Sequence, residues 1–274
     1  MKGRRPLCIL WLSAVLSLFS THCVSAVAPS DTSDFWILTA LEPPFSQRNE
    51  RGQLEDYLIE LVAGILADAN IGQPILAAPW ERLISEAQQK ANVVIFPLAR
   101  TPEREDQFHW VLPLTANVYG VLGKTSPSHP ISNIADLTTV SPIGVFENDF
   151  RHKLLLAENV QNVASYKDYN SAVSDLVSGQ LSSLFFSDAG LRYFCFKQQA
   201  DCSDMKILYQ YDTLTSYIAL SKNTDTGHIK IMNDAAERFF RSQKFKQIQQ
   251  TWLQKLRAQG PLKLHIKDGV LNLW

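Results

Sequence analysis

The feature that most constrains the fold is a regular alternation of short apolar runs with segments whose apolar residues recur at helical spacing. The runs FWILTA (35–40), PILAA (74–78) and NVVIFPLA (92–99) are typical of buried strands. Between the first two lies QLEDYLIELVAGILADAN (53–70), whose apolar residues share one helical face: Leu54, Tyr57, Leu58, Leu61, Val62, Ile65 and Leu66. The segment 80–91 has a similar face. This alternation predicts an α/β fold with largely parallel sheets.

The second half of the chain repeats the alternation. Strand-like runs occur at 142–146, 181–187 and 217–221. The segment YNSAVSDLVSGQ predicts a helix that ends at Gly179. The segments HIKIMNDAAERFF and KFKQIQQTWLQKL predict two late helices, and the tail 260–274 is expected to add a small strand or arm.

The N-terminus has the three parts of a secretory signal peptide. Lys2, Arg4 and Arg5 precede the apolar run PLCILWLSAVLSLF, and the small residues VSA end the segment at Ala26. The run is shorter than the about 20 residues that a membrane span needs. Cys23 follows STH and lacks the small residue expected before a lipid-modified cysteine. We therefore expect cleavage after residue 26 and a soluble periplasmic protein; an uncleaved anchor is the alternative.

Charge and cysteine content narrow the possible partners. Cleavage leaves about 248 residues with 23 basic and 27 acidic side chains, a size that can divide into two lobes. This balance disfavours nucleic acid and a polybasic membrane contact. In an oxidising compartment, Cys195 and Cys202 are expected to form a structural disulfide, because no further metal ligands lie near them in the sequence.

A compact group of charges, ARTPERED (99–106), follows the third predicted strand. Ligands of α/β proteins gather at the carboxyl ends of strands. An arginine there offers a planar fork of donors for a carboxylate or phosphate. Arg104 is therefore a candidate anion receptor; the alternative is a surface ion pair with Glu103 or Asp106.

Four motifs occur in one order: EPPF from Glu42, PWERL from Pro79, ARTPERE from Ala99, and LVSGQLSSLFFSD ending at Asp188. Together with the signal peptide they resemble the family 3, amino-acid-type periplasmic solute-binding proteins over roughly residues 34–258. The resemblance implies a type II periplasmic binding fold, the "Venus flytrap", with two α/β lobes and two crossing hinge strands. Residues 27–118 and 216–274 would form one lobe and 119–215 the other, with hinges near 117–122 and 215–221. The cleft would close on its ligand.

The resemblance also implies a ligand site. Arg104 would clamp an α-carboxylate, with Thr101 opening the turn and Ala99 ending the strand before it. Asp188, which closes a second-lobe strand, would grip an α-amino group. The expected partner is a small polar solute bound by a monomer, and an ABC permease or a membrane receptor could then receive the loaded protein.

The sequence departs from the family pattern at three places. Glu42 stands where amino-acid binders commonly have an aromatic residue, and Glu147, Asn148 and Asp149 replace an anion-binding turn. The third strand reads ANVVIF where the family usually has a preceding Gly and an Asp, a change expected to be structural. Glu42, Asp188 and Glu147 would suit a cationic group, while Arg104 and Arg82 would hold an anionic one. Basic amino acids, amines and small peptides fit this pattern. The alternatives are that Glu42 faces solvent, that Trp80 belongs to the core, and that Phe45 packs beneath the cleft rather than lining it.

The sequence lacks G-x-S-x-G, H-E-x-x-H, P-loop and G-x-G-x-x-G motifs. The histidines beyond residue 26 are scattered, and no two have metal-ligand spacing. No catalytic residue, metal or cofactor is therefore predicted, and the protein is expected not to be an enzyme. Two alternatives stay open: a sensing module for a membrane receptor, and an enzyme like the periplasmic dehydratases of this fold that act on prephenate-like acids.

Overall fold

The computed structural model describes residues 35–125, 130–140, 142–258 and 262–273. All of them belong to one compact unit, residues 31–274. The predicted signal peptide, residues 1–26, lies outside the described residues, as do Cys8 and Cys23 within it.

In the described residues, one mixed sheet of ten strands organises the chain. Its main path runs in the order β4 (Ile75–Ala77), β1 (Trp36–Thr39), β5 (Val93–Ala99), β10 (Lys206–Ser221), β6 (Phe108–Gly123), β9 (Ser183–Ser187), β7 (Ile143–Phe146) and β8 (Val163–Tyr166). The strands β1, β4 and β5 run parallel to one another, and so do β7, β8 and β9. Parallel strands joined by helices are what the alternation of the sequence predicted.

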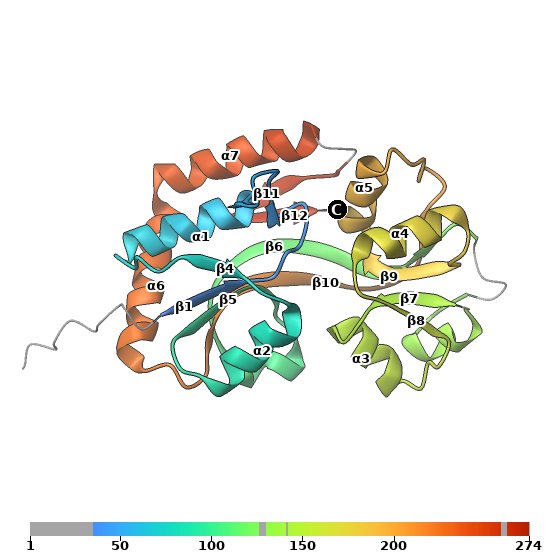
Figure 1. Cartoon of the computed structure of the whole chain (residues 1–274), viewed down its shortest axis with the longest axis horizontal. Helices are drawn as coiled ribbons and strands as arrows, with labels where there is room; N and C mark the ends of the chain where they lie inside the picture. Colours follow the sequence, from blue (N-terminus) through green and yellow to red (C-terminus); the bar gives the residue numbers. More distant parts are fainter. Residues whose placement is uncertain (1–34, 126–129, 141, 259–261, 274) are drawn as a thin grey trace, which may run out of the picture. The chain divides into compact units, whose positions relative to one another are not determined.

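The strands β6 and β10, with sixteen residues each, join the two ends of the sheet (Figure 1). They pair antiparallel from Phe108 opposite Ser221 to Gly123 opposite Lys206. At one end β10 also pairs with β5, and at the other end β6 also pairs with β9. The sequence prediction placed a strand only at 217–221. The structure begins β10 at Lys206, and its first eight residues are exposed or half-buried rather than core residues.

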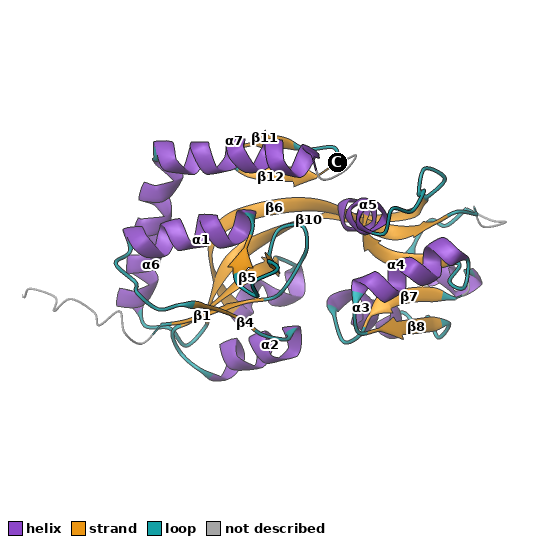
Figure 2. Ribbon diagram, turned by 45° about the horizontal axis from the view of Figure 1, so that its top comes forward, coloured by secondary structure: helices purple, strands orange, loops and turns teal. Residues whose placement is uncertain are grey.

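The first end of the sheet carries the helices α1 (Tyr57–Asp68), α2 (Trp80–Gln89), α6 (Thr226–Arg241) and α7 (Gln243–Ala258). Figures 1 and 2 show α1 and α7 on one side of β1 and β5, with α2 on the other. The apolar face predicted for α1 is buried from Tyr57 to Leu66. Leu54 is an exception: it lies in the strand β3 (Leu54–Glu55), because Asp56 adopts φ 108° and interrupts a helical path.

The second end of the sheet carries α3 (Phe150–Ala157), α4 (Tyr169–Ser178) and α5 (Asp188–Lys197). Gly179 ends α4 with φ 84°, as predicted for a left-handed helix cap. The helix α3 begins after Asp149, which caps it, where the family resemblance implied a helix. The elements α5 and β8 were not predicted. The helix α5 is buried along most of its length, so its sequence shows little polar alternation. The disulfide between Cys195 and Cys202 is present, as predicted.

The tail forms a hairpin of β11 (His265–Lys267) and β12 (Val270–Leu273). The strand β12 pairs in parallel with β6 at Thr115–Asn117, and Leu271 and Leu273 are buried. The prediction of an added strand is therefore confirmed. A second hairpin consists of β2 (Gln47–Arg48) and β3, and two short 3-10 helices, η2 (Pro102–Gln107) and η3 (Ile134–Thr139), complete the described elements.

Candidate functional site

A pocket of about 870 Å³ lies where connections from both ends of the sheet meet. From the first end it is lined by the segment after β1, the start of α2, the end of β5 and η2; from the second end, by the β7–α3 and β8–α4 connections. Tyr119 of β6 and Ser216 of β10 also line it. Because the carboxyl ends of parallel strands converge here, this is where an α/β sheet is expected to bind a ligand.

Arg104 is the basic group that the first end of the sheet presents from η2. Its Nη1 donates a hydrogen bond to the carbonyl of Ala99 at 3.2 Å, and its guanidinium lies 5.4 Å from the ring centroid of Trp80. Among the described residues Arg104 makes no ion pair. Burial lowers the pKa of Arg104, against the opposite effect of Asp149. The pocket therefore holds a half-buried cation with little compensation.

The ion pair of the charged turn is made by Arg100 rather than by Arg104. The Arg100 Nε donates to Glu105 Oε2 at 2.7 Å. The Arg100 guanidinium also lies over the rings of Trp110 and Tyr217, at 5.4 and 5.2 Å from their centroids. The two arginines of one turn are therefore divided: one stabilises the turn, and the other faces the pocket.

Glu42 is the acid that the segment after β1 places in the pocket. Its backbone N–H is held by Ser46, at 2.9 Å from the carbonyl and 3.0 Å from the hydroxyl of that residue. The side chain is half-buried and hydrogen-bonded to Tyr119. Burial raises the pKa of Glu42; Arg151 opposes this shift and Asp149 adds to it. A positive group of a ligand would relieve the cost of ionising this carboxyl.

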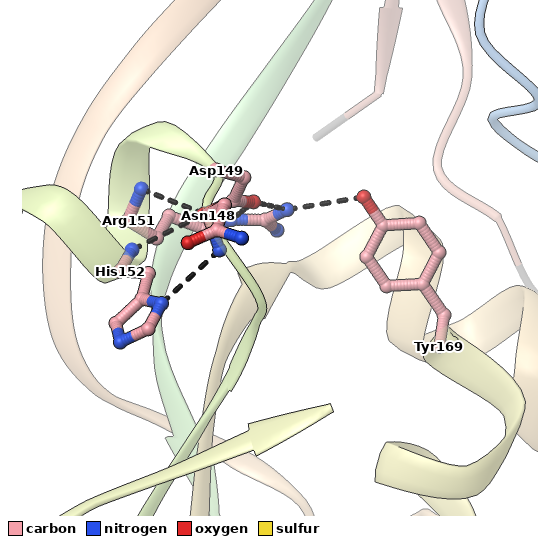
Figure 3. A network of polar contacts seen from close by, with 5 residues as sticks. All are labelled: Asn148, Asp149, Arg151, His152 and Tyr169. Atoms are coloured by element: carbon pink, nitrogen blue, oxygen red, sulfur yellow. Dashed lines mark hydrogen bonds and ion pairs between the residues drawn. The ribbon is translucent and has the colours of Figure 1, made fainter. Parts of the chain in front are cut away.

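Asp149 and Arg151 form a buried ion pair in the pocket wall (Figure 3). The Arg151 Nε donates to Asp149 Oδ2 at 2.6 Å, and Arg151 Nη2 donates to the Tyr169 hydroxyl at 3.1 Å. Burial acts to lower the pKa of Arg151, but Asp149 and the neighbouring tyrosines outweigh it and the net shift is upward. Sequence reasoning did not single out Arg151. The sequence did contain a signal that Arg151 has a structural partner: it stands two residues after Asp149, which caps the helix, and between the aromatic residues Phe150 and His152.

Some of the other predicted ligand residues line the pocket and some do not. Ala99 and Glu147 line the pocket. Thr101 is buried directly behind Arg104, whose backbone N–H donates to the Thr101 carbonyl at 3.0 Å. Trp80, considered as a possible core residue, is partly buried and lines the pocket.

Four predicted residues are not among those lining the pocket in the described part of the chain: Thr101, Phe45, Arg82 and Asp188. Phe45 is 3% exposed and packs in the core beneath α1. Arg82 is exposed and lies 3.7 Å from Glu86 one turn along α2. Asp188 begins α5 and lies 3.3 Å from Arg192 Nε. Of the three acids expected to suit a cationic group, Glu42 and Glu147 line the pocket and Asp188 does not.

Among residues 35–125, 130–140, 142–258 and 262–273, no group of three or more His, Cys, Asp or Glu side chains could hold a metal ion. In the same ranges, no helix combines the length and the apolar character needed to cross a membrane.

The chain is similar to several known proteins. It is 22% identical over 167 residues to the arginine-binding periplasmic protein of Mannheimia haemolytica, covering 60% of this chain and 67% of the relative. A histidine kinase sensor domain with similarity to periplasmic binding proteins superposes with a TM-score of 0.68 at 13% identity, over 81% of this chain and 97% of that domain. A mutant of ArgBP from T. maritima superposes with a TM-score of 0.64 at 18% identity, over 80% and 95% of the two chains.

These superpositions show the type II periplasmic binding fold that the resemblance implied. The profile of the family described as "Bacterial extracellular solute-binding proteins, family 3" matches residues 37–255, which is most of the chain. The protein therefore belongs to the family 3 bacterial extracellular solute-binding proteins.

Proposed function

We propose that this protein captures a small amino-acid-like solute in the pocket between β5, α2 and the β7–α3 connection. The observation that carries the proposal is the pairing of two incompletely compensated groups in one pocket: the Arg104 guanidinium and the Glu42 carboxyl. Arg104 would bind the carboxylate of the solute, and Glu42 would bind its ammonium or guanidinium group. The relative from Mannheimia haemolytica, an arginine-binding protein, supports a cationic amino acid or a related amine or peptide.

Closure of the pocket around the solute is part of the proposal. We assign residues 27–118 and 216–274 to one lobe and 119–215 to the other, with β6 and β10 as the two crossing strands. Each strand pairs with partners at both ends of the sheet, so bending within them would move the two pocket walls relative to each other. The solute can favour the closed form only by contacting it better than the open form.

We further propose that the loaded protein acts in the periplasm as a monomer and delivers the solute to an ABC permease, with a membrane receptor as the alternative partner. The superposition on a histidine kinase sensor domain shows that the fold also occurs in sensing proteins. Uptake of labelled solute by cells with and without the protein separates import from sensing. No turnover is proposed, so conversion of a prephenate-like acid by the purified protein would contradict the binding function.

The decisive experiment measures solute binding by calorimetry and thermal shift, with amino acids, polyamines, short peptides and organic acids as candidates. A solute at about 100 times its dissociation constant stabilises the native state by about 2.7 kcal/mol. Arg104→Ala should weaken binding by about 2 kcal/mol or more, which is about thirty-fold, because a desolvated charge loses its partner.

Matched controls come from the same chain. Arg82→Ala removes an exposed arginine outside the pocket lining and should leave affinity unchanged. Glu42→Gln and Asp188→Asn decide which acid holds the cationic group, since only the first residue lines the pocket. Equal affinity of Arg104→Ala and the wild type would refute the assignment of Arg104 as the anion receptor.

A further inference from the structure

The guanidinium of Arg151 is enclosed by aromatic rings. Its central carbon lies 5.7 Å from the ring centroid of Tyr119, 5.5 Å from Phe150, 5.6 Å from Tyr169 and 5.3 Å from Phe186. The side chain is 4% exposed. These four rings, here called the aromatic cage, come from β6, α3, α4 and β9. Rings that surround a planar cation at such distances form a receptor for guanidinium and ammonium groups.

The cage also has the anion that such a receptor needs. Asp149 pairs with Arg151 from one side, while the Tyr169 hydroxyl accepts a hydrogen bond from Arg151 Nη2 at 3.1 Å (Figure 3). Arg151 and three of the cage residues, Tyr119, Phe150 and Tyr169, line the solute pocket. A receptor for a cationic head group is therefore built into the pocket wall, and a side chain of the protein fills it.

The same pair also occupies the start of α3. Asp149 Oδ1 accepts hydrogen bonds from the backbone N–H of Arg151 at 2.8 Å and of His152 at 3.2 Å. The backbone N–H of Asn148 donates to His152 Nδ1 at 3.1 Å. Three of the donors with which this helix N-terminus could bind the carboxylate of a solute, the N–H groups of Asn148, Arg151 and His152, are thus already bonded within the chain.

We propose that Arg151 is a built-in occupant of the aromatic cage and determines which solutes the pocket accepts. With Arg151 in place, the cage is closed to a cationic group of the solute. With Asp149 in place, the start of α3 is closed to an anionic group of the solute. The charged groups of the solute are then held elsewhere in the pocket, by Arg104 and Glu42 from the first end and by Glu147, Lys167 or Asp168 from the second. The pocket therefore binds a cationic group of the solute without the cage, and it disfavours a solute whose cationic head needs an aromatic cage around it.

Arg151 also acts on Glu42 from within the cage. Its positive charge opposes the upward shift that burial imposes on the pKa of Glu42, and so it favours the ionised carboxyl. If the Arg151 guanidinium left the cage, the negative charges of Asp149 and Glu42 would both lose a nearby positive charge. The bound Arg151 thus keeps Glu42 available for a cationic group of the solute.

The proposed role in solute choice rests on the proposed function, but the occupancy of the cage is tested without the solute. Arg151→Ala empties the cage, and methylguanidinium chloride is then titrated at millimolar concentration while thermal unfolding is followed. The unfolding midpoint of Arg151→Ala should rise and saturate with methylguanidinium, because a ligand bound to the native state stabilises it by mass action. Urea, a planar neutral analogue, and sodium chloride should produce no such rise.

Arg192→Ala is the matched control. Arg192 is half-buried and is bonded, like Arg151, to an acid, and also to backbone carbonyls. Among the described residues no aromatic ring lies over its guanidinium, and it does not line the pocket. An equal response of Arg192→Ala and Arg151→Ala to methylguanidinium would overturn the proposal. Once a solute is known, Arg151→Ala should also gain affinity for agmatine relative to that solute, and a failure of the proposed function would leave the cage titration unaffected.

A second variant covers poor folding of Arg151→Ala, which leaves Asp149 buried without its partner. The double substitution Arg151→Ala with Asp149→Asn removes both charges and keeps a good helix-capping residue. Its cage should still bind methylguanidinium, more weakly, and absence of that response would overturn the proposal. If neither variant is recovered folded, refolding yield is the readout: recovery with methylguanidinium and not with urea supports the proposal, and no difference refutes it.

Discussion

Asn148 Nδ2 donates a hydrogen bond to Glu81 Oε1, although 67 positions separate the two residues in the sequence. Glu81 lies in the first turn of α2, and Asn148 lies in the β7–α3 connection with φ 60°. Both residues line the pocket, on opposite walls. This contact therefore bridges the two ends of the sheet without passing through β6 or β10.

The bridge between Glu81 and Asn148 is expected to slow release of the solute. Glu81→Ala should lower affinity by about 0.5–1.5 kcal/mol, mainly through faster dissociation, because an exposed hydrogen bond contributes only modestly. Asn148→Gly removes the amide while keeping a residue that accepts φ 60°. Stopped-flow dissociation rates of the two single variants and the double variant form a thermodynamic cycle, and strictly additive effects would show that the contact contributes nothing.

Solute binding is expected to depend on pH through Glu42. Because burial raises the pKa of Glu42, part of its population is protonated at pH values where an exposed glutamate is ionised. A cationic group favours the ionised form, so affinity should rise as pH increases through the pKa of Glu42, and binding should release protons. Calorimetry in buffers of different ionisation enthalpy counts these protons. Glu42→Gln should abolish the release, and a pH-independent affinity in the wild type would contradict the assignment.

Asp56 is expected to destabilise the folded protein at neutral pH. It precedes α1, is 3% exposed, and has an Oδ2 with no hydrogen-bond partner among the described residues. Burial, with Glu55 adding to it, raises the pKa of Asp56 from 3.8 to about 6; Gln47, Lys255 and Lys197 oppose the shift. The native state therefore holds this proton more tightly than the unfolded chain, and the free energy of unfolding falls as pH rises between about 4 and 6.

Asp56→Asn removes this titration. The variant should be more stable than the wild type by up to about 3 kcal/mol near pH 7, with the difference vanishing below about pH 4. The control is Asp225→Asn at the start of α6. Asp225 accepts hydrogen bonds from the backbone N–H of Gly227 and His228, and its pKa is lowered, so this variant should lose stability at neutral pH. Denaturant unfolding at several pH values measures both, and a stability difference for Asp56→Asn that does not vary with pH would contradict the raised pKa.

The disulfide between Cys195 and Cys202 is expected to support stability more than binding. It closes a short loop of sequence separation 7, for which chain entropy gives about 2.5 kcal/mol. Replacing both cysteines by alanine should lower the free energy of unfolding by about that amount, as should reduction of the wild type. Neither cysteine lines the pocket, so affinity should be kept. Lost affinity would mean that the loop positions Phe194, which does line the pocket.

Much of the scaffold could be predicted because the information was local. The seven residues of β5 are all buried, and their apolar run identified a core strand. Tyr57 to Leu66 gave the buried face of α1, and Gly179 marked the end of α4. Cys195 and Cys202 lie seven positions apart in the sequence and pair with each other, as predicted. Each of these features depends on residues that lie close together in the sequence.

The pocket was predicted in part. The charged turn at residues 99–106, which follows the third predicted strand, indicated where a ligand would bind. The predicted residues Arg104, Ala99, Glu42 and Glu147 do line the pocket. Asp188 followed a strand in the same way, yet Arg192 lies four residues later on the same helix and pairs with it. That spacing was visible in the sequence, and it favours a local ion pair.

The sequence by itself determined the alternating elements, the capping residues, the disulfide and the position of the charged turn. Tertiary structure alone decided that Arg100 pairs and stacks while Arg104 faces the pocket, because Tyr217, which lies over Arg100, comes from β10 more than a hundred residues away. It also decided that Arg151 fills an aromatic cage, since the four rings come from β6, α3, α4 and β9. Charge compensation depends on neighbours in space, and a sequence shows only neighbours along the chain.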